Sequence, residues 1–118
     1  IAAAIQADGG LDAVRSLHAL GVETGIANGA SVNNTASSAN GGAGYIEATA
    51  FTGTSVTVKV QHSTDDAVWA DLITFAAIDA ARDYERKTVT GTINQYLRAR
   101  HDSGTFTSVT DVVAFARL

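Results

Sequence analysis

Residues 55–62 read SVTVKVQH, and this stretch decides the fold class. Its three valines, Val56, Val58 and Val60, alternate with polar residues. Successive side chains of an extended chain point to opposite faces, so the valines share one face and the polar residues share the other. The stretch therefore predicts a β-strand with one face in a core and one face toward water.

Two aspartates and the chain's one tryptophan, Trp69, follow this strand directly. Asp65 and Asp66, with His62 close by, could offer metal ligands. Calcium loops, however, need further oxygen donors at fixed offsets, where this sequence has apolar residues. Aspartates at the tip of a hairpin instead cap backbone amides. We predict a tight acidic turn here and no metal site.

Segments of strand length recur along the chain, separated by turn-forming Gly, Asn and Asp residues. Short strands at such spacing are typical of an antiparallel sandwich or barrel. We predict an all-β fold, an antiparallel jelly-roll-like β-sandwich of about eight strands. The expected strands are 3–7, 16–22, 45–52, 55–62, 72–78, 84–90, 95–101 and 110–117. Residues 1–24 hold the leading strands, 25–40 a long loop, and 41–118 the main strands.

Residues 71–87 allow a second interpretation. They contain neither Gly nor Pro and include four alanines, so intrinsic propensity alone favours a helix. A helix would place Asp79 and Asp83 on the same side as Leu72 and Phe75, which spoils its buried stripe. We therefore predict a strand, a turn around 79–83 and a second strand.

The composition limits the classes of function. The chain has 118 residues, the size of a single domain, and 46% of them are hydrophobic. Its formal net charge of −4 argues against a nucleic-acid partner, which requires a basic stripe. No apolar run has the length of a membrane span, so no membrane partner is expected either. The chain begins at Ile1, and we expect it to be a fragment of a longer gene product.

Catalytic chemistry has little support in the sequence. Asp83 and Glu85 share one face of an expected strand, at a spacing within reach of an inverting glycosidase pair. A solvated ladder of mixed charges explains them better, since basic residues surround them. His18, His62 and His101 are far apart in the sequence, and no serine lies in a nucleophile-elbow motif. We predict a chain that is not an enzyme, with no catalytic, cofactor or metal site.

Aromatic and basic side chains are the candidates for binding. Exposed aromatic rings on a sandwich can stack on sugars, although such large apolar groups are more often buried in the core or at its rim. Arg98 and Arg100 alternate with Leu97 and Ala99, so the two cations share a face, which suits an interface ion pair or a solvated surface. The candidate glycan or interface contacts are Tyr45, Trp69, Tyr84, Tyr96, Arg98 and Arg100.

Three stretches carry a resemblance to a known family: SVTVKVQHSTDDAVWADLITF at 55–75, ERKTVTGTINQYLRA at 85–99 and VVAFARL at 112–118. Their order resembles the C-terminal jelly-roll region of tail-tube-like and other structural proteins of tailed bacteriophages. The stretches 6–21 and 36–53 look like the earlier segments of that region. The arrangement is also similar to discoidin-like and carbohydrate-binding jelly rolls.

The phage resemblance implies a non-catalytic structural and interaction domain of a virion, in the tail or on the capsid surface. Its expected partners are other copies of itself and other virion proteins. Its expected location is the virion, assembled in the host cytoplasm and then extracellular. The alternative is a carbohydrate-binding module that adheres to host surface glycans, and a hydrolase ranks last.

Overall fold

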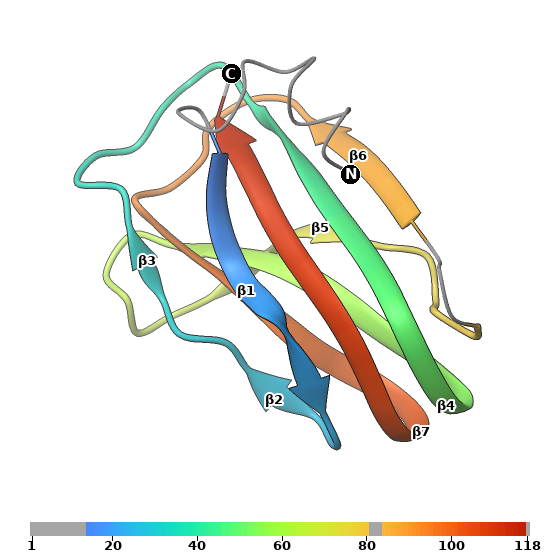
Figure 1. The fold of residues 1–118 in the computed structure, drawn as a ribbon. Coiled ribbons are helices and arrows are strands. Elements are labelled where there is room, and N and C mark those ends of the chain that lie inside the picture. The colour runs from blue at the N-terminus through green and yellow to red at the C-terminus, as the bar shows by residue number, and fades with distance from the viewer. Residues whose placement is uncertain (1–13, 81–83, 118) are drawn as a thin grey trace.

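The computed structural model describes residues 14–80 and 84–117. These residues form an all-β structure without a helix, so none of their segments is a helix able to cross a membrane. Within this described part the strands make one seven-stranded antiparallel sheet (Figure 1). The prediction of an all-β antiparallel fold is confirmed. The strands are β1 (Val14–Glu23), β2 (Ala27–Asn28), β3 (Val32–Asn33), β4 (Gly42–Ser63), β5 (Ala70–Thr74), β6 (Tyr84–Val89) and β7 (Tyr96–Arg117).

Two strands of 22 residues each, β4 and β7, form the centre of the sheet. They pair along their whole length, from Gly42 opposite Arg117 to Ser63 opposite Tyr96. The sequence predicted four separate strands here, 45–52, 55–62, 95–101 and 110–117, and that prediction is wrong about the breaks. The pairing continues through the expected turns, so β4 and β7 make one long two-stranded ribbon.

The ribbon bends where the turns were expected. Gly53 and Gly104 have φ values of 143° and 130°, in a region that residues with side chains rarely adopt. Shifts of pairing register flank Gly53, and irregularities of this kind bend a strand and increase its twist. In Figure 1 both long strands curve back at their common lower end, so that one half of the ribbon lies in front of the other.

The two halves of the ribbon have different neighbours. β1 pairs with β7 at residues 109–116, and β6 pairs with β4 at Gly42–Glu47. β5 pairs with β4 at residues 59–62, while β2 and β3 pair with β7 at residues 96–101. Each half therefore has a strand segment along both of its sides.

The main hydrophobic core lies between the two halves. Val56, Val58 and Val60 are fully buried, as their alternation predicted. They belong to one cluster with residues of the other half, including Val113 and Phe115. Burial of these side chains against each other provides the largest favourable contribution to folding.

The described residues of the segment 71–87, which are 71–80 and 84–87, contain strands and no helix. β6 matches the strand predicted at 84–90, but β5 ends at Thr74 and so covers only part of the strand predicted at 72–78; beyond it, Ile78 forms an isolated bridge with Val56. The turn expected at 79–83 is described only at residues 79 and 80.

Two further predictions concern residues before the long ribbon. The segment 25–40 is mostly irregular, as expected, but it also holds the two-residue strands β2 and β3. The expected strand at 16–22 lies within β1, while the one expected at 3–7 falls outside the described residues.

Candidate functional site

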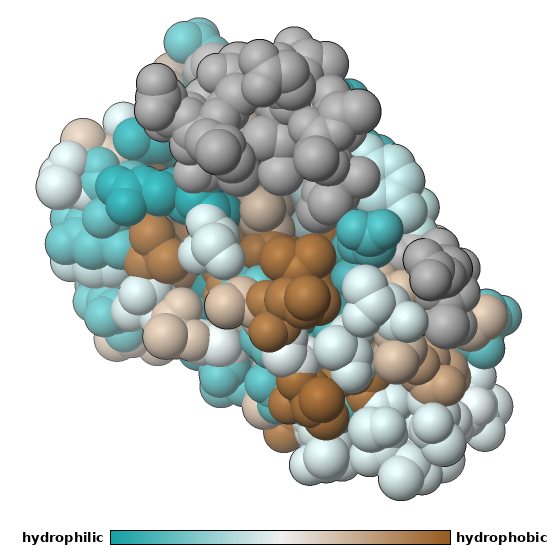
Figure 2. Space-filling model, in the orientation of Figure 1, coloured by the Kyte–Doolittle hydropathy of each residue, from teal (hydrophilic) through white to brown (hydrophobic). Residues whose placement is uncertain are grey.

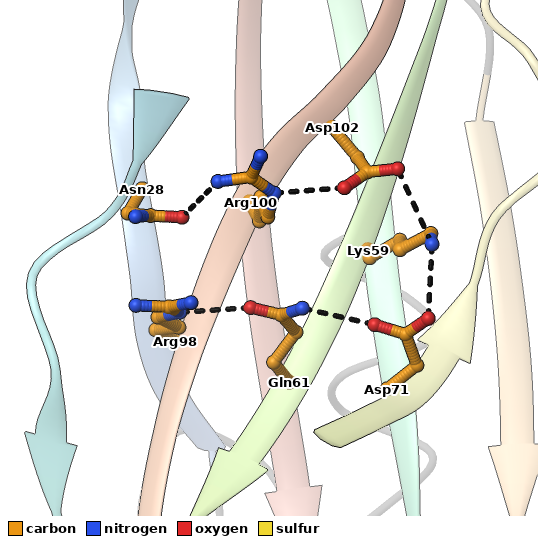
Figure 3. A network of polar contacts seen from close by, with 7 residues as sticks. All are labelled: Asn28, Lys59, Gln61, Asp71, Arg98, Arg100 and Asp102. Carbon is orange, nitrogen blue, oxygen red and sulfur yellow. Dashed lines mark hydrogen bonds and ion pairs between the residues drawn. The ribbon is translucent and has the colours of Figure 1, made fainter. Parts of the chain in front are cut away.

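A connected network of polar side chains lies on the half of the sheet that carries β5, on the side away from the core (Figure 3). We call this surface the Arg98 face. Its members come from four strands and from the loop before β5. They are Asn28, Lys59, Gln61, Trp69, Asp71, Arg98, Arg100 and Asp102.

Strand alternation places these side chains together. On β7, Arg98 and Arg100 alternate with Leu97 and Ala99, which are 0% and 1% exposed. The prediction that the arginines share the face opposite this apolar pair is confirmed. Lys59 and Gln61 alternate with the buried valines of β4 in the same way, so the outward side of each strand is polar.

Cross-strand pairing brings the charges into register. Arg98 lies opposite Gln61, and Arg100 lies opposite Lys59. Two cations directly opposite each other destabilise a sheet unless anions lie between them. Asp102 lies between Lys59 and Arg100 and pairs with both, and Asp71 on β5 pairs with Lys59 from its other side.

One branch of the network runs from β7 across β4 to β5. Arg98 Nε donates to Gln61 Oε1 at 2.8 Å, and Gln61 Nε2 donates to Asp71 Oδ1 at 2.9 Å. Lys59 Nζ then donates to the other oxygen of Asp71, also at 2.9 Å. Gln61 is 9% exposed, so its amide is held between an arginine and a carboxylate with little access for water.

A second branch returns along β7. Lys59 Nζ lies 3.2 Å from Asp102 Oδ2, and Arg100 Nε donates to Asp102 Oδ1 at 2.7 Å. Arg100 Nη1 also donates to Asn28 Oδ1 on β2. With three cations and two carboxylates, the Arg98 face has a net charge of +1 on a chain whose net charge is −4.

These contacts shift the ionisation of the network. Hydrogen bonds to Asp71 and Asp102 raise the pKa of Lys59. The amide of Gln61, followed by Lys59, lowers the pKa of Asp71, and the guanidinium of Arg100 lowers the pKa of Asp102. All three groups are therefore charged at neutral pH.

Trp69 lies against this network. The Arg98 guanidinium carbon is 4.3 Å from the centre of a Trp69 ring, a cation–π contact. Trp69 is half-buried and does not belong to the main core, so it is a rim residue. Arg98 uses Nε for its hydrogen bond to Gln61, and no hydrogen bond from its two terminal nitrogens to another described residue is seen.

The structure separates the six predicted contact residues. Trp69, Arg98 and Arg100 meet on the Arg98 face, and Tyr96 lies on the same side of β7, half-buried. Tyr84 is 45% exposed on β6, in the other half of the ribbon. Tyr45 is 0% exposed and packs with Ala43, Ala114 and Ala116, so its candidate role as a surface contact is wrong. Both faces of β4 are buried around Tyr45, which its sequence pattern did not indicate.

Several members of the Arg98 face were not predicted as contacts. Lys59, Gln61, Asp71 and Asp102 are all outward residues of strands. For Lys59, Gln61 and Asp71, alternation with apolar residues was a usable signal for the surface. Their mutual hydrogen bonds depend on cross-strand register, which one sequence does not reveal.

The acidic turn after β4 has the predicted structure. Asp65 Oδ1 accepts hydrogen bonds from the amides of Ala67 and Val68 at 3.0 and 2.9 Å. These amides lower the pKa of Asp65. Asp66 adopts φ of 61°, and Ser63 Oγ accepts from both aspartate amides. The turn is therefore held by its own side chains.

A hollow of about 340 Å³ lies at a different place, lined by Ile46, Tyr84, Glu85 and residues 76–79. Glu85 Oε1 accepts a hydrogen bond from the amide of Ala76 at 2.7 Å, so this carboxylate fastens β6 to the segment after β5. Asp83, its expected partner in a glycosidase pair, lies outside the described residues.

Comparison with known proteins gives a likeness of fold. No family model matches the chain, and no curated protein matches it. Among solved structures, the SPBc2 prophage-derived protein YomS is similar, with a TM-score of 0.52 and 12% sequence identity. The likeness covers 87% of this chain and 89% of that chain. The chain therefore shares its fold with a prophage-derived protein.

Proposed function

We propose that this chain is a non-catalytic structural and interaction domain of a bacteriophage particle, located in the virion. The observation that carries the proposal is the fold shared with a prophage-derived protein over 87% of the chain. An ordered polar network covering one surface, with its carboxylates committed to ion pairs, suits a contact surface better than a reaction site.

The topology supports a jelly-roll sandwich. If the bends divide β4 and β7, one layer holds β1, β7, β4 and β6. The other layer holds the pair β2 and β3, then β7, β4 and β5. With the short β2 and β3 counted as one edge strand, the two layers hold eight segments, the number found in a jelly roll. A jelly roll is also the fold that the phage resemblance implied.

Two surfaces suit contacts with other copies of the chain or with other virion proteins. The first is the Arg98 face, where the terminal nitrogens of Arg98 can bind a carboxylate in a fork geometry. The second lies over β1, where Leu20 and Val22 are 62% and 61% exposed. Figure 2 shows apolar surface gathered over β1 and the neighbouring part of β7. Among the described strands β1 pairs only with β7, so its other side can meet a partner.

The test is whether the chain is part of a particle. Virions from the source are separated on a density gradient, and each fraction is analysed by quantitative mass spectrometry. We expect peptides of this chain to follow the major structural proteins in a constant ratio across the particle peak. Peptides that stay in the soluble fractions, with none in the particle peak, would refute the proposal.

A glycan-binding role is the second candidate, and the position of the half-buried Trp69 on a polar face favours it. Arg98 already covers one face of the indole, so a sugar ring would need the opposite face. Glycan-array binding that Trp69→Ala abolishes and Tyr84→Ala preserves would support this role. An array without signal would leave the structural role as the better one.

A further inference from the structure

A second cluster of charged groups lies between β1 and β7, apart from the Arg98 face. His101 and Asp111, both on β7, are 1% and 0% exposed. They lie on either side of the bend at Gly104, and both point into the core. Register shifts on either side of His18 in β1 disturb the regular alternation there, and His18 contacts Asp111. The two imidazole rings are 5.0 Å apart in an edge-to-face arrangement.

The positions of two protons follow from the partners. His18 Nδ1 lies 3.0 Å from the main-chain oxygen of Asp111, which can only accept, so Nδ1 carries a hydrogen. His101 Nε2 lies 2.8 Å from Asp111 Oδ2, so Nε2 carries one as well. Each ring then keeps one basic nitrogen, which is Nε2 in His18 and Nδ1 in His101.

The basic nitrogen of His18 faces another acceptor. His18 Nε2 lies 3.1 Å from Glu23 Oε1. A nitrogen lone pair and a carboxylate oxygen repel each other at this distance unless a positive charge lies between them. Asp111 Oδ1 also lacks a compensating partner. This fully buried oxygen is 3.2 Å from His18 Nδ1 but makes no hydrogen bond of good geometry, and an unpaired buried oxygen is costly.

The charge of the cluster favours a divalent cation. With neutral imidazoles, Glu23 and Asp111 give it a charge of −2. The Glu23 side chain is 30% exposed, whereas Asp111 is fully buried, and an uncompensated buried charge is costly. One additional proton on His18 leaves −1, whereas a divalent ion makes the cluster neutral. A ligand atom of each of His18, Glu23 and His101 lies within 4.8 Å of the other two.

We propose that His18, Glu23 and His101 bind a divalent transition-metal ion of the Zn²⁺ type. Two nitrogens and one carboxylate oxygen are a ligand set that zinc accepts, with water as a fourth ligand. Tetrahedral bonds of about 2.0 Å separate ligand atoms by about 3.3 Å, close to the 3.1 Å between His18 Nε2 and Glu23 Oε1. The main-chain oxygen of Asp111 accepts from the far nitrogen of His18, and its carboxylate accepts from Nε2 of His101, so both rings have the kind of outer acceptor found at metal sites.

The first experiment uses the whole chain. After treatment with a chelator, it is titrated with ZnCl₂ in a calorimeter, and its melting temperature is measured with and without Zn²⁺. We expect one ion per chain and a melting temperature that rises with Zn²⁺, because a ligand bound only by the folded state stabilises it. Absence of both effects refutes the site.

The second experiment locates the site. Glu23→Gln and His18→Gln keep the approximate size of the side chains, and each should weaken Zn²⁺ binding by about 10-fold or more. Glu47→Gln, on β4 outside the cluster, should leave binding unchanged. Co²⁺ in place of Zn²⁺ should give the visible absorption of a four-coordinate site. Equal affinity in all three variants would show that the ion binds elsewhere and would refute the proposal.

Discussion

The bend of the long ribbon depends on Gly104, and replacing this residue tests the fold. In Gly104→Ala the new Cβ would lie 2.2 Å from the main-chain oxygen of Ser55 and 2.8 Å from the Cα of Val56. Both neighbours are backbone atoms of β4, so they cannot move aside as a flexible side chain would. The φ of 130° adds strain, because residues with a Cβ rarely adopt it.

The magnitude can be separated into its two causes with matched variants. Gly91 has φ of 89°, but a Cβ added to it would have no atom within 4 Å, so Gly91→Ala measures backbone strain alone, about 1–2 kcal/mol. Gly104→Ala adds the clash, about 1–3 kcal/mol more, for a total of about 2–5 kcal/mol. Gly25 has neither a positive φ nor a neighbour within 4 Å, so Gly25→Ala should be neutral or stabilising by up to about 1 kcal/mol.

The assay is urea denaturation followed by circular dichroism, with melting temperature as a second measure. A loss of 1 kcal/mol corresponds to about 4 °C for a chain of this size. We expect the order of stability Gly25→Ala, Gly91→Ala, Gly104→Ala, from highest to lowest. If Gly104→Ala is as stable as Gly25→Ala to within about 0.5 kcal/mol, the bend does not lie at Gly104 and the reasoning fails.

Three further predictions concern the core, the Arg98 face and pH. Val58→Ala should lower the free energy of unfolding by about 2–3 kcal/mol, because Val58 is fully buried. The outward Thr57→Ala should lower it by less than about 1 kcal/mol. Equal losses in the two variants would contradict the assigned faces. A double-mutant cycle of Arg98→Gln and Trp69→Phe should give a coupling of about 0.5–1 kcal/mol, and strict additivity would show that the stacked contact contributes nothing. Burial lowers the pKa of His62 below its usual 6.5. Just below pH 6.5 the unfolded chain therefore binds more protons than the folded chain, and the free energy of unfolding should fall as the pH drops through this range. His62→Gln should flatten this part of the pH dependence, and an unchanged curve would show that His62 is not its source.

The local structure could be predicted from the sequence where one face of a strand is apolar. The alternation of Val56, Val58 and Val60 identified a strand and its buried face, and Asp65 identified the turn. The pattern at Leu97 to Arg100 likewise placed two arginines outward. In each case the signal lies within a few residues of the structure that it predicts.

The long-range arrangement could not be predicted in this way. Gly53 and Gly104 read as turns because glycine permits both a turn and a bend within a strand, and only the pairing of β4 with β7 distinguishes the two. Tyr45 read as a possible contact because its own strand pattern does not show that both faces of β4 are buried there.

The meeting of two histidines was hidden for the same reason. His18 and His101 come together because β1 pairs with β7 and β7 then bends. Sequence distance made them look unrelated, although each is a typical metal ligand. Their contact is a product of the topology.

The most direct test of the bent ribbon is a nuclear Overhauser measurement between the ring protons of His18 and His101. A ribbon folded over on itself holds these rings edge to face with centres 5.0 Å apart, so we expect a cross-peak between them. A straight ribbon would carry His101 away from β1. Absence of the cross-peak in a folded sample, with both rings assigned, would contradict the fold and the site built on it.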